Sequence, residues 1–296
     1  MSLIRPAREP SVVRSSTSGT VGYLFGLLEA AAVPGTVLVP LLTDLGVSRP
    51  AVRTMLSRMV AAGNLTSQRV GRIAVYRLAG PYAERFHRFR NGDISAPVWE
   101  GRFQLVLYTI PEARRQHRDD LRDMAFRSGF GAARPGVLIG LRDPRHWCGP
   151  WLAAEDFSVE LGELACSLPT ARRLAERAWH LSATQLTLTA FLDELVDLAA
   201  RLGDGSSSGR TDRDAFRQQA ELWERWAVIV VRLPVLPAVL APQPWPVLEL
   251  TQALVAVTRL LEPGASSHAQ TVIGRAEGAD LLEPLPDRRS GSVEAH

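Results

Sequence analysis

The segment from Arg49 to Gly63 carries five side chains that can donate hydrogen bonds, at helical spacing. They are Arg49, Arg53, Thr54, Ser57 and Arg58. Guanidinium groups bind phosphates and the edges of guanine bases, and short hydroxyl side chains bond to phosphates and to several bases. Together these residue types allow recognition of a nucleic acid, because they can reach the backbone and the base edges at the same time.

The same segment is predicted to form one helix. Ser48 is a good N-cap residue, Pro50 is tolerated in the first turn, and Gly63 is placed to end the helix. At about 100° per residue the donors share one side of this helix, and apolar residues share the other. The apolar residues are Ala51, Val52, Met55, Leu56, Met59 and Val60. We expect the helix to bury one face and to present a basic one, which either binds DNA or is simply solvated.

The flanking segments complete a predicted DNA-binding domain over residues 21–90. A buried helix is expected from Val21 to Ala32, and a second helix begins near Pro40 and ends at Leu45. After the basic helix, residues 65–70 and 73–78 have the pattern of two strands around a glycine turn, with Arg69 and Arg72 in the hairpin. This order of elements predicts a winged helix-turn-helix, in which the third helix enters the major groove and the wing touches the flanking backbone.

The distribution of charge singles out the same region. All 34 basic residues are arginine; residues 1–90 hold 12 of them against 4 acidic residues, whereas residues 91–296 hold 22 against 27. A basic N-terminal third on an acidic body is expected when one domain binds a polyanion. Residues 1–20 show no periodicity and are predicted to form a flexible arm.

The rest of the chain predicts two further domains, so that the fold class is α+β. A strand over 102–110, a polar-faced helix over 111–130 and a strand over 136–141 indicate a ferredoxin-like central domain at residues 99–169. Residues 170–262 are predicted to form a helical C-terminal domain for effector binding or dimerisation. Its helices are expected at 171–202, 214–231 and 247–261, with a flexible linker at 203–212. Residues 263–296 are predicted to be disordered.

No catalytic, metal or cofactor site is predicted. Cys148 and Cys166 lack the spacing of metal ligands, and the six histidines are scattered. The glycines of GFGAARPG, residues 129–136, are followed by no lysine and lead into no helix, so we expect a turn between a helix and a strand. The charged N-terminus and the interrupted apolar run at 226–241 predict a cytoplasmic protein without a membrane span.

Four tryptophans and one arginine of the helical part form a candidate effector site. They are Trp179, Trp223, Trp226, Arg232 and Trp245. Aromatic-lined cavities between helices are common small-molecule sites. Packing of the tryptophans in the core is the alternative.

Several segments resemble the PaaX family of bacterial repressors of phenylacetate catabolism. They are SRPAVRTMLSRMVAAGNL, RVGRIAVYRL, WEGRFQLVLYTIPEARRQHRDDLR, GFGAARPGVLIGLRDP, RAWHL and the stretch that ends in APQPWP, in family order over residues 20–262. The resemblance implies a homodimeric, cytoplasmic transcription factor that binds double-stranded operator DNA and is released by a small effector of the aryl or acyl-CoA type. The recognition positions carry over to the five donors above, and those of the wing to Arg69 and Arg72.

The chain departs from the family pattern in two places. The wing has Ile73, Ala74 and Val75 where relatives tend to be more polar, and residues 223–237 are poorer in His, Glu and Arg than the same stretch of relatives. The second departure suggests a ligand more apolar than an acyl-CoA.

The central domain also resembles small CRISPR-associated endonucleases, which have an aspartate at the end of the first strand. Here that position is Thr109, so the carboxylate that would anchor a divalent ion is missing. An architectural DNA-binding protein without an effector and, more remotely, a metal-dependent nuclease remain the alternatives to a repressor.

Overall fold

The computed structural model describes residues 16–91, 98–153, 156–204 and 209–286. These residues form an α+β protein with two four-stranded antiparallel sheets. The chain divides into two compact units. The N-terminal unit comprises Met1–Asp93, Gly205–Val228 and Thr258–His296, and the central unit comprises Ile94–Asp204 and Ile229–Val257. Residues distant in sequence therefore complete each unit, and these boundaries differ from those of the three predicted domains.

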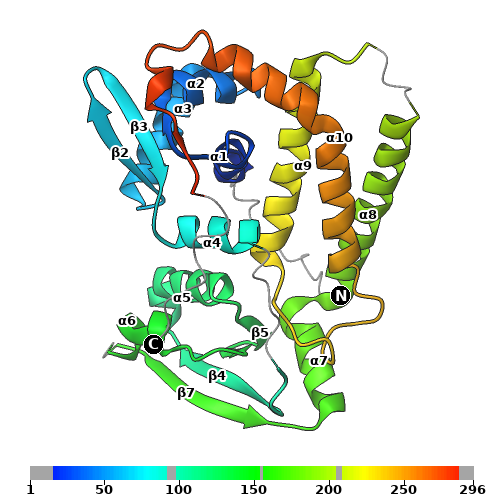
Figure 1. Cartoon of the computed structure of the whole chain (residues 1–296). Helices are drawn as coiled ribbons and strands as arrows, with labels where there is room; N and C mark the ends of the chain where they lie inside the picture. Colours follow the sequence, from blue (N-terminus) through cyan, green and yellow to red (C-terminus); the bar gives the residue numbers. More distant parts are fainter. Residues whose placement is uncertain (1–15, 92–97, 154–155, 205–208, 287–296) are drawn as a thin grey trace, which may run out of the picture. The chain divides into compact units, whose positions relative to one another are not determined.

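The N-terminal unit begins with alternating helices and strands (Figure 1). They are α1 (Ser16–Leu27), β1 (Ala30–Pro34), α2 (Gly35–Asp44), α3 (Arg49–Ala61), β2 (Leu65–Val70), β3 (Ile73–Leu78) and α4 (Gly80–Asn91). The sheet has the order β2-β3-β1-β8, where β8 is Glu283–Pro284. Helices α9 (Asp212–Arg232) and α10 (Val247–Ile273) each contribute a part to this unit.

Three predictions for the start of this unit are wrong in detail. Helix α1 begins at Ser16, within the segment predicted as a flexible arm; residues 1–15 lie outside the described part. Ala30–Pro34 is a strand and not the end of a helix, because Glu29 has a φ of 46° and β1 pairs with β3 and β8. Helix α2 begins at Gly35, so Pro40 lies inside it and forgoes one backbone hydrogen bond.

The core of the N-terminal unit joins α3 to the C-terminal helices. Leu24, Leu41 and Leu56 are buried in one cluster with Phe216 of α9 and Ala265 of α10. Burial of such side chains removes apolar surface from water, which is the main driving force for folding. Helix α3 therefore folds on a core that includes residues more than 150 positions further along the chain.

The prediction of a disordered tail from residue 263 is wrong for the described residues up to 286. Helix α10 continues through Pro263 to Ile273, and Ala265 and Ala269 are buried in the core. The following residues form β8, which pairs with β1. The burial of Ala265 and Ala269, which lie four residues apart on one helix face, stabilises the helix. This stabilisation outweighs the low helix propensity of Pro263 and Gly264. Residues 287–296 lie outside the described part.

The central unit is built on the second sheet. Its elements are β4 (Arg102–Thr109), the short 3-10 helix η1 (Glu112–Arg114), α5 (Arg115–Arg127), β5 (Gly131–Arg134), β6 (Val137–Gly140), α6 (Arg145–Leu152), β7 (Ser158–Ala165), α7 (Leu168–Trp179) and α8 (Leu181–Gly203). The strand order is β5-β6-β4-β7, with every neighbouring pair antiparallel. Helices α5 and α6 cover one face of this sheet, and α7 packs on the other (Figure 1).

Two predictions for this unit are corrected. The segment GFGAARPG was expected to be only a turn, but Gly131–Arg134 is an edge strand paired with β6, and the turn is confined to the residues around Gly136. The predicted helix over 171–202 is two helices, because His180 adopts the left-handed conformation with a φ of 51° between them.

Gly131 of β5 permits a close approach of the sheet to the backbone of α7. A Cβ atom at this position would lie 2.5 Å from the carbonyl oxygen of Ala178. Because the obstacle is backbone, we expect Gly131→Ala to destabilise the protein by about 1–3 kcal/mol. In urea denaturation followed by circular dichroism, the matched control Gly162→Ala on β7, where a Cβ would meet open space, should keep the wild-type midpoint. Equal midpoints for both variants would contradict the close packing.

Candidate nucleic-acid interface

Helix α3 presents the predicted donors on its outer face. The Ser48 hydroxyl accepts a hydrogen bond from the Ala51 backbone N–H at 3.4 Å and caps the helix, as predicted, and Gly63 follows its end with a φ of 69°. All five predicted donors, Arg49, Arg53, Thr54, Ser57 and Arg58, are exposed. Val52, Leu56 and Met59 are buried on the opposite side. Ala51 was expected on the apolar side but is exposed in the first turn.

The hairpin after α3 has the predicted strands and turn. Its register runs from the pair Leu65 and Leu78 to the pair Val70 and Ile73, and the turn places Gly71 at a φ of 60°. Arg69 and Arg72 are exposed near this turn. Figure 1 shows the hairpin of β2 and β3 extending away from the helices of its unit. The two arginines are thereby held by a regular backbone at the end of a projecting element.

Three arginines of α3 and two near the turn of the hairpin are unpaired in the described part of the structure, whereas Arg77 of β3 is paired with Glu283. The chain contains no acidic residue between Asp44 and Glu84. Among the residues that the structure describes, none pairs with Arg49, Arg53, Arg58, Arg69 or Arg72. Elsewhere the arginines are commonly neutralised, as Arg118 is by Glu112 at 2.9 Å. Five uncompensated guanidinium groups on two adjacent elements form a surface of positive potential that attracts polyanions.

A charged cluster holds the turn between α2 and α3 against the C-terminal helices. The Asp44 carboxylate accepts from Arg213 at 2.6 Å and lies 3.0 Å from His268 Nε2, while the Asp44 carbonyl accepts from Arg217 at 2.7 Å. Arg213 and Arg217 lie on α9, and His268 lies on α10. Sequence reasoning missed this cluster, because Asp44 lies about 170 or more positions from each of the other members. We infer that it fixes the start of α3.

We expect Asp44→Ala to loosen this turn. The substitution removes the carboxylate that Arg213 and the mostly buried His268 ring contact. We expect this loss to lower the free energy of unfolding by about 1–3 kcal/mol. Urea denaturation measures this loss. The matched control is Asp123→Ala, which removes an exposed carboxylate from α5 and should change the midpoint little. A wild-type midpoint for Asp44→Ala would show that the cluster does not stabilise the fold.

Buried hydrogen bonds connect α1 to α9, and α9 to α10. The Tyr23 hydroxyl donates to Gln219 Oε1 at 2.7 Å, and Gln219 Nε2 donates to the Thr258 carbonyl at 3.0 Å. Burial raises the pKa of Tyr23 far above its usual value, so the hydroxyl keeps the proton that it donates. The Tyr82 hydroxyl of α4 accepts from the Gly22 N–H at 2.8 Å, and burial raises its pKa to about 12. These bonds give the helices behind α3 a defined arrangement.

The apolar wing residues have a structural explanation. Ile73 packs against the backbone of Gly278, because a Cβ atom added to Gly278 would lie 2.3 Å from the Cδ1 atom of Ile73. Val75 is buried. Arg77 of the same strand forms an ion pair with Glu283 of β8. The C-terminal segment therefore covers part of β3, which accounts for the apolar side chains at these positions.

The structure distributes the five candidate effector residues over both units. Trp179 and Trp245 belong to one apolar cluster of the central unit, whereas Trp223 packs in the core of the N-terminal unit and Trp226 is buried there. The side chain of Arg232 lies outside the described part. None of the five lines the hollow described below. The effector site at these residues stays a prediction.

The described residues form no metal site, and the two cysteines are free thiols. Thr109 is the last residue of β4, and within the described ranges no group of three or more His, Cys, Asp or Glu residues is placed to hold a metal ion. Cys148 and Cys166 are free, and burial raises the pKa of both thiols. None of the described helices is long and apolar enough to cross a membrane.

Fold and surface together define an α+β protein that exposes a basic helix and a basic hairpin on one unit. Comparison with protein-family models gives three successive matches. They are PaaX-like protein at residues 24–81, PaaX protein central Cas2-like domain at 96–156 and PaaX-like protein C-terminal domain at 179–271. The chain belongs to the PaaX family.

The proteins that resemble most of this chain include a transcriptional repressor and a solved structure. The transcriptional repressor PaaX of Escherichia coli (strain K12) is 26% identical over 250 residues, which cover 80% of this chain and 78% of the repressor. Among solved structures, the uncharacterized protein Rv0674 from Mycobacterium tuberculosis superimposes with a TM-score of 0.49 at 22% identity, over 86% of this chain and 98% of the other.

Proposed function

We propose that the protein is a DNA-binding transcriptional repressor that reads an operator with α3 and the β2–β3 hairpin. The observation that carries this proposal is the exposed set of five unpaired arginines on these two elements. The name of the Escherichia coli relative, a transcriptional repressor, supports the same function. Neither observation favours an enzyme.

In this proposal the N-terminal unit acts as a winged helix-turn-helix. The succession of α2, the turn at Gly46, α3 and the β2–β3 hairpin supports this assignment. Helix α3 would lie in the major groove, with Arg53 and Arg58 at base edges or phosphates and Arg49, Thr54 and Ser57 completing the contacts. Arg69 and Arg72 of the wing would bind the flanking phosphates.

The central unit is proposed to serve as a ferredoxin-like scaffold. Strands β4, β5, β6 and β7 with α5 and α6 follow the order β-α-β-β-α-β, which supports this architecture. Thr109 at the end of β4 offers no carboxylate for a divalent ion, so we assign the unit to structure or dimerisation and not to cleavage of DNA.

We propose further that the repressor is a cytoplasmic homodimer released by a small effector of the aryl or acyl type. A ligand that prefers the native state must raise the melting temperature. We expect at least one member of a panel of aryl, acyl and CoA compounds to do so and to weaken DNA binding. An architectural protein without an effector would respond to none of them.

The function is tested by selecting binding sites from genomic DNA. Purified protein is mixed with sheared DNA of its own organism, and the bound fragments are sequenced. We expect enrichment of a few sites with two-fold symmetry and half-sites about 34 Å apart, as a dimer of such domains requires. Uniform recovery of the genome would contradict sequence-specific repression, and a monomer at micromolar concentration in analytical ultracentrifugation would contradict the dimer.

A further inference from the structure

A hollow in the central unit lies between α5, α6 and the start of β7. Its volume is about 450 Å³, and it is lined by Arg114, His117, Asp120, Pro150, Trp151, Asp156 and Phe157. This volume falls in the range of small-molecule sites. His117 and Asp120 lie on one face of α5 at a spacing of three residues. The opposite wall comes from the end of α6 and from the segment that enters β7.

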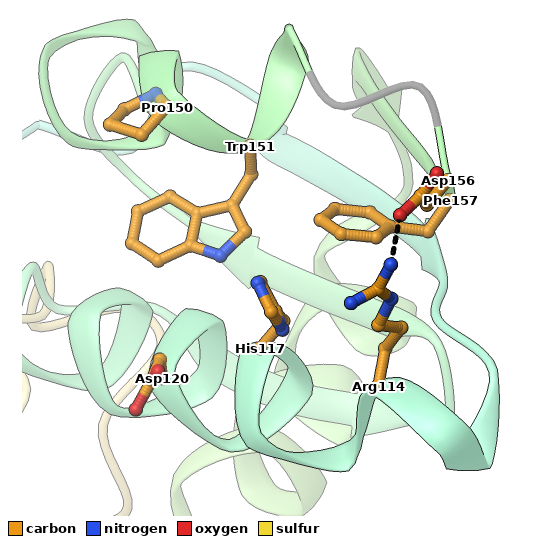
Figure 2. Close-up of a pocket in the computed structure, with 7 residues that line it drawn as sticks. All are labelled: Arg114, His117, Asp120, Pro150, Trp151, Asp156 and Phe157. Carbon is orange, nitrogen blue, oxygen red and sulfur yellow. Dashed lines mark hydrogen bonds and ion pairs between the residues drawn. The ribbon is translucent and has the colours of Figure 1, made fainter.

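Aromatic rings form much of the wall. Figure 2 shows the side chains of Trp151, His117 and Phe157 around one space. The ring centroids of His117 and Phe157 are 5.8 Å apart, and Trp151 packs edge-on against Trp147 at 6.5 Å. The ring centroids of Trp147 and the buried Phe130 are 5.2 Å apart, so the indole of Trp151 rests on side chains of the core. The rings are therefore largely in place before a ligand arrives.

The charge of the lining favours a cation. Arg114 is already neutralised by Asp156, with which it forms an ion pair at one end of the hollow (Figure 2). Asp120 has no cationic partner among the described residues and accepts only from Gln116 Nε2 at 2.9 Å. Because Arg114 and Asp156 cancel each other, the Asp120 carboxylate gives the arginine and aspartate side chains of the lining an excess negative charge. The faces of indole and phenyl rings are also negative and attract ammonium groups.

We propose that this hollow is a binding site for a small organic ammonium compound with an attached aromatic or apolar group. The ammonium group lies between the Asp120 carboxylate and the face of Trp151, and the apolar group packs against Phe157 and Pro150. The same charges disfavour carboxylates and phosphates. Binding concerns the free protein and does not depend on its affinity for DNA.

The test is calorimetric titration with three probes of one shape, namely 3-phenylpropan-1-amine, 3-phenylpropan-1-ol and 3-phenylpropanoate. We expect the amine to bind about tenfold more tightly than the alcohol and the carboxylate to bind most weakly. Asp120→Asn should remove the preference for the amine and leave the alcohol unaffected. Trp151→Leu should weaken both. The matched control Asp123→Asn, which neutralises an exposed carboxylate of the same helix outside the hollow, should behave as wild type.

Three results would overturn the proposal. They are absence of amine binding, equal or tighter binding of the alcohol or the carboxylate, and an unchanged preference for the amine in Asp120→Asn. Circular dichroism establishes that each variant is folded. If Trp151→Leu unfolds because the indole supports the core, the isosteric Asp120→Asn still decides the question.

Discussion

Replacement of Arg53 or Arg58 by alanine is expected to reduce operator affinity by about 1–3 kcal/mol when the side chain reads a base edge. Both residues are exposed on α3 and lack a hydrogen-bond or ion-pair partner in the described structure, so in the proposed complex their loss would remove a contact to DNA without breaking such a bond within the protein. The unfolding midpoint should therefore stay at its wild-type value. Fluorescence anisotropy with a labelled operator duplex measures the change in affinity.

The matched control is Arg201→Ala, which removes an exposed arginine from α8 in the central unit. This variant lowers the net charge by the same amount and should bind the operator almost as wild type does. If Arg53→Ala and Arg58→Ala both keep wild-type affinity and selectivity, the assignment of α3 as the recognition helix is wrong.

The buried face of α3 gives the second large effect. Leu56 has a relative exposure of 1% and lies in the core of the N-terminal unit, so we expect Leu56→Ala to destabilise this unit by about 2–5 kcal/mol. The loss combines the removed apolar contacts with the cavity that they leave. Urea denaturation followed by circular dichroism measures it, and DNA binding should fall with the folded fraction.

Leu248→Ala provides the comparison, because Leu248 has a relative exposure of 66% on α10. Such a surface substitution should change the free energy of unfolding by no more than about 0.5 kcal/mol. Equal effects of the two substitutions would mean that Leu56 is not a core residue.

The basic helix could be predicted from the sequence because its signals are local. A cap at Ser48, a terminating glycine at Gly63 and a 3.6-residue period all lie within one segment, and the structure places them as expected. The hairpin at residues 65–78 is likewise marked by strand-forming residues around a glycine turn. The α+β class follows from the alternation of such segments.

The remaining features depend on contacts that sequence reasoning could not anticipate. β1 begins with three helix-favouring alanines, yet it is a strand because β3 and β8 pair with it. The segment after Pro263 is polar and contains glycine, yet it stays helical because Ala265 and Ala269 are buried against distant residues. The Asp44 cluster and the hollow beside Trp151 likewise unite residues from separate elements, so only the folded chain shows them.

The central claim is that α3 and the hairpin together bind a specific DNA sequence. Its most direct test is the affinity of wild type and Arg53→Ala for upstream DNA of the protein's own gene and for a scrambled duplex, measured across a salt series. We predict tight, selective wild-type binding that falls steeply with salt, since each arginine bound to phosphate releases about one counterion, and a loss of selectivity in the variant. Equal wild-type affinity for both duplexes, or no binding to either, would contradict the account.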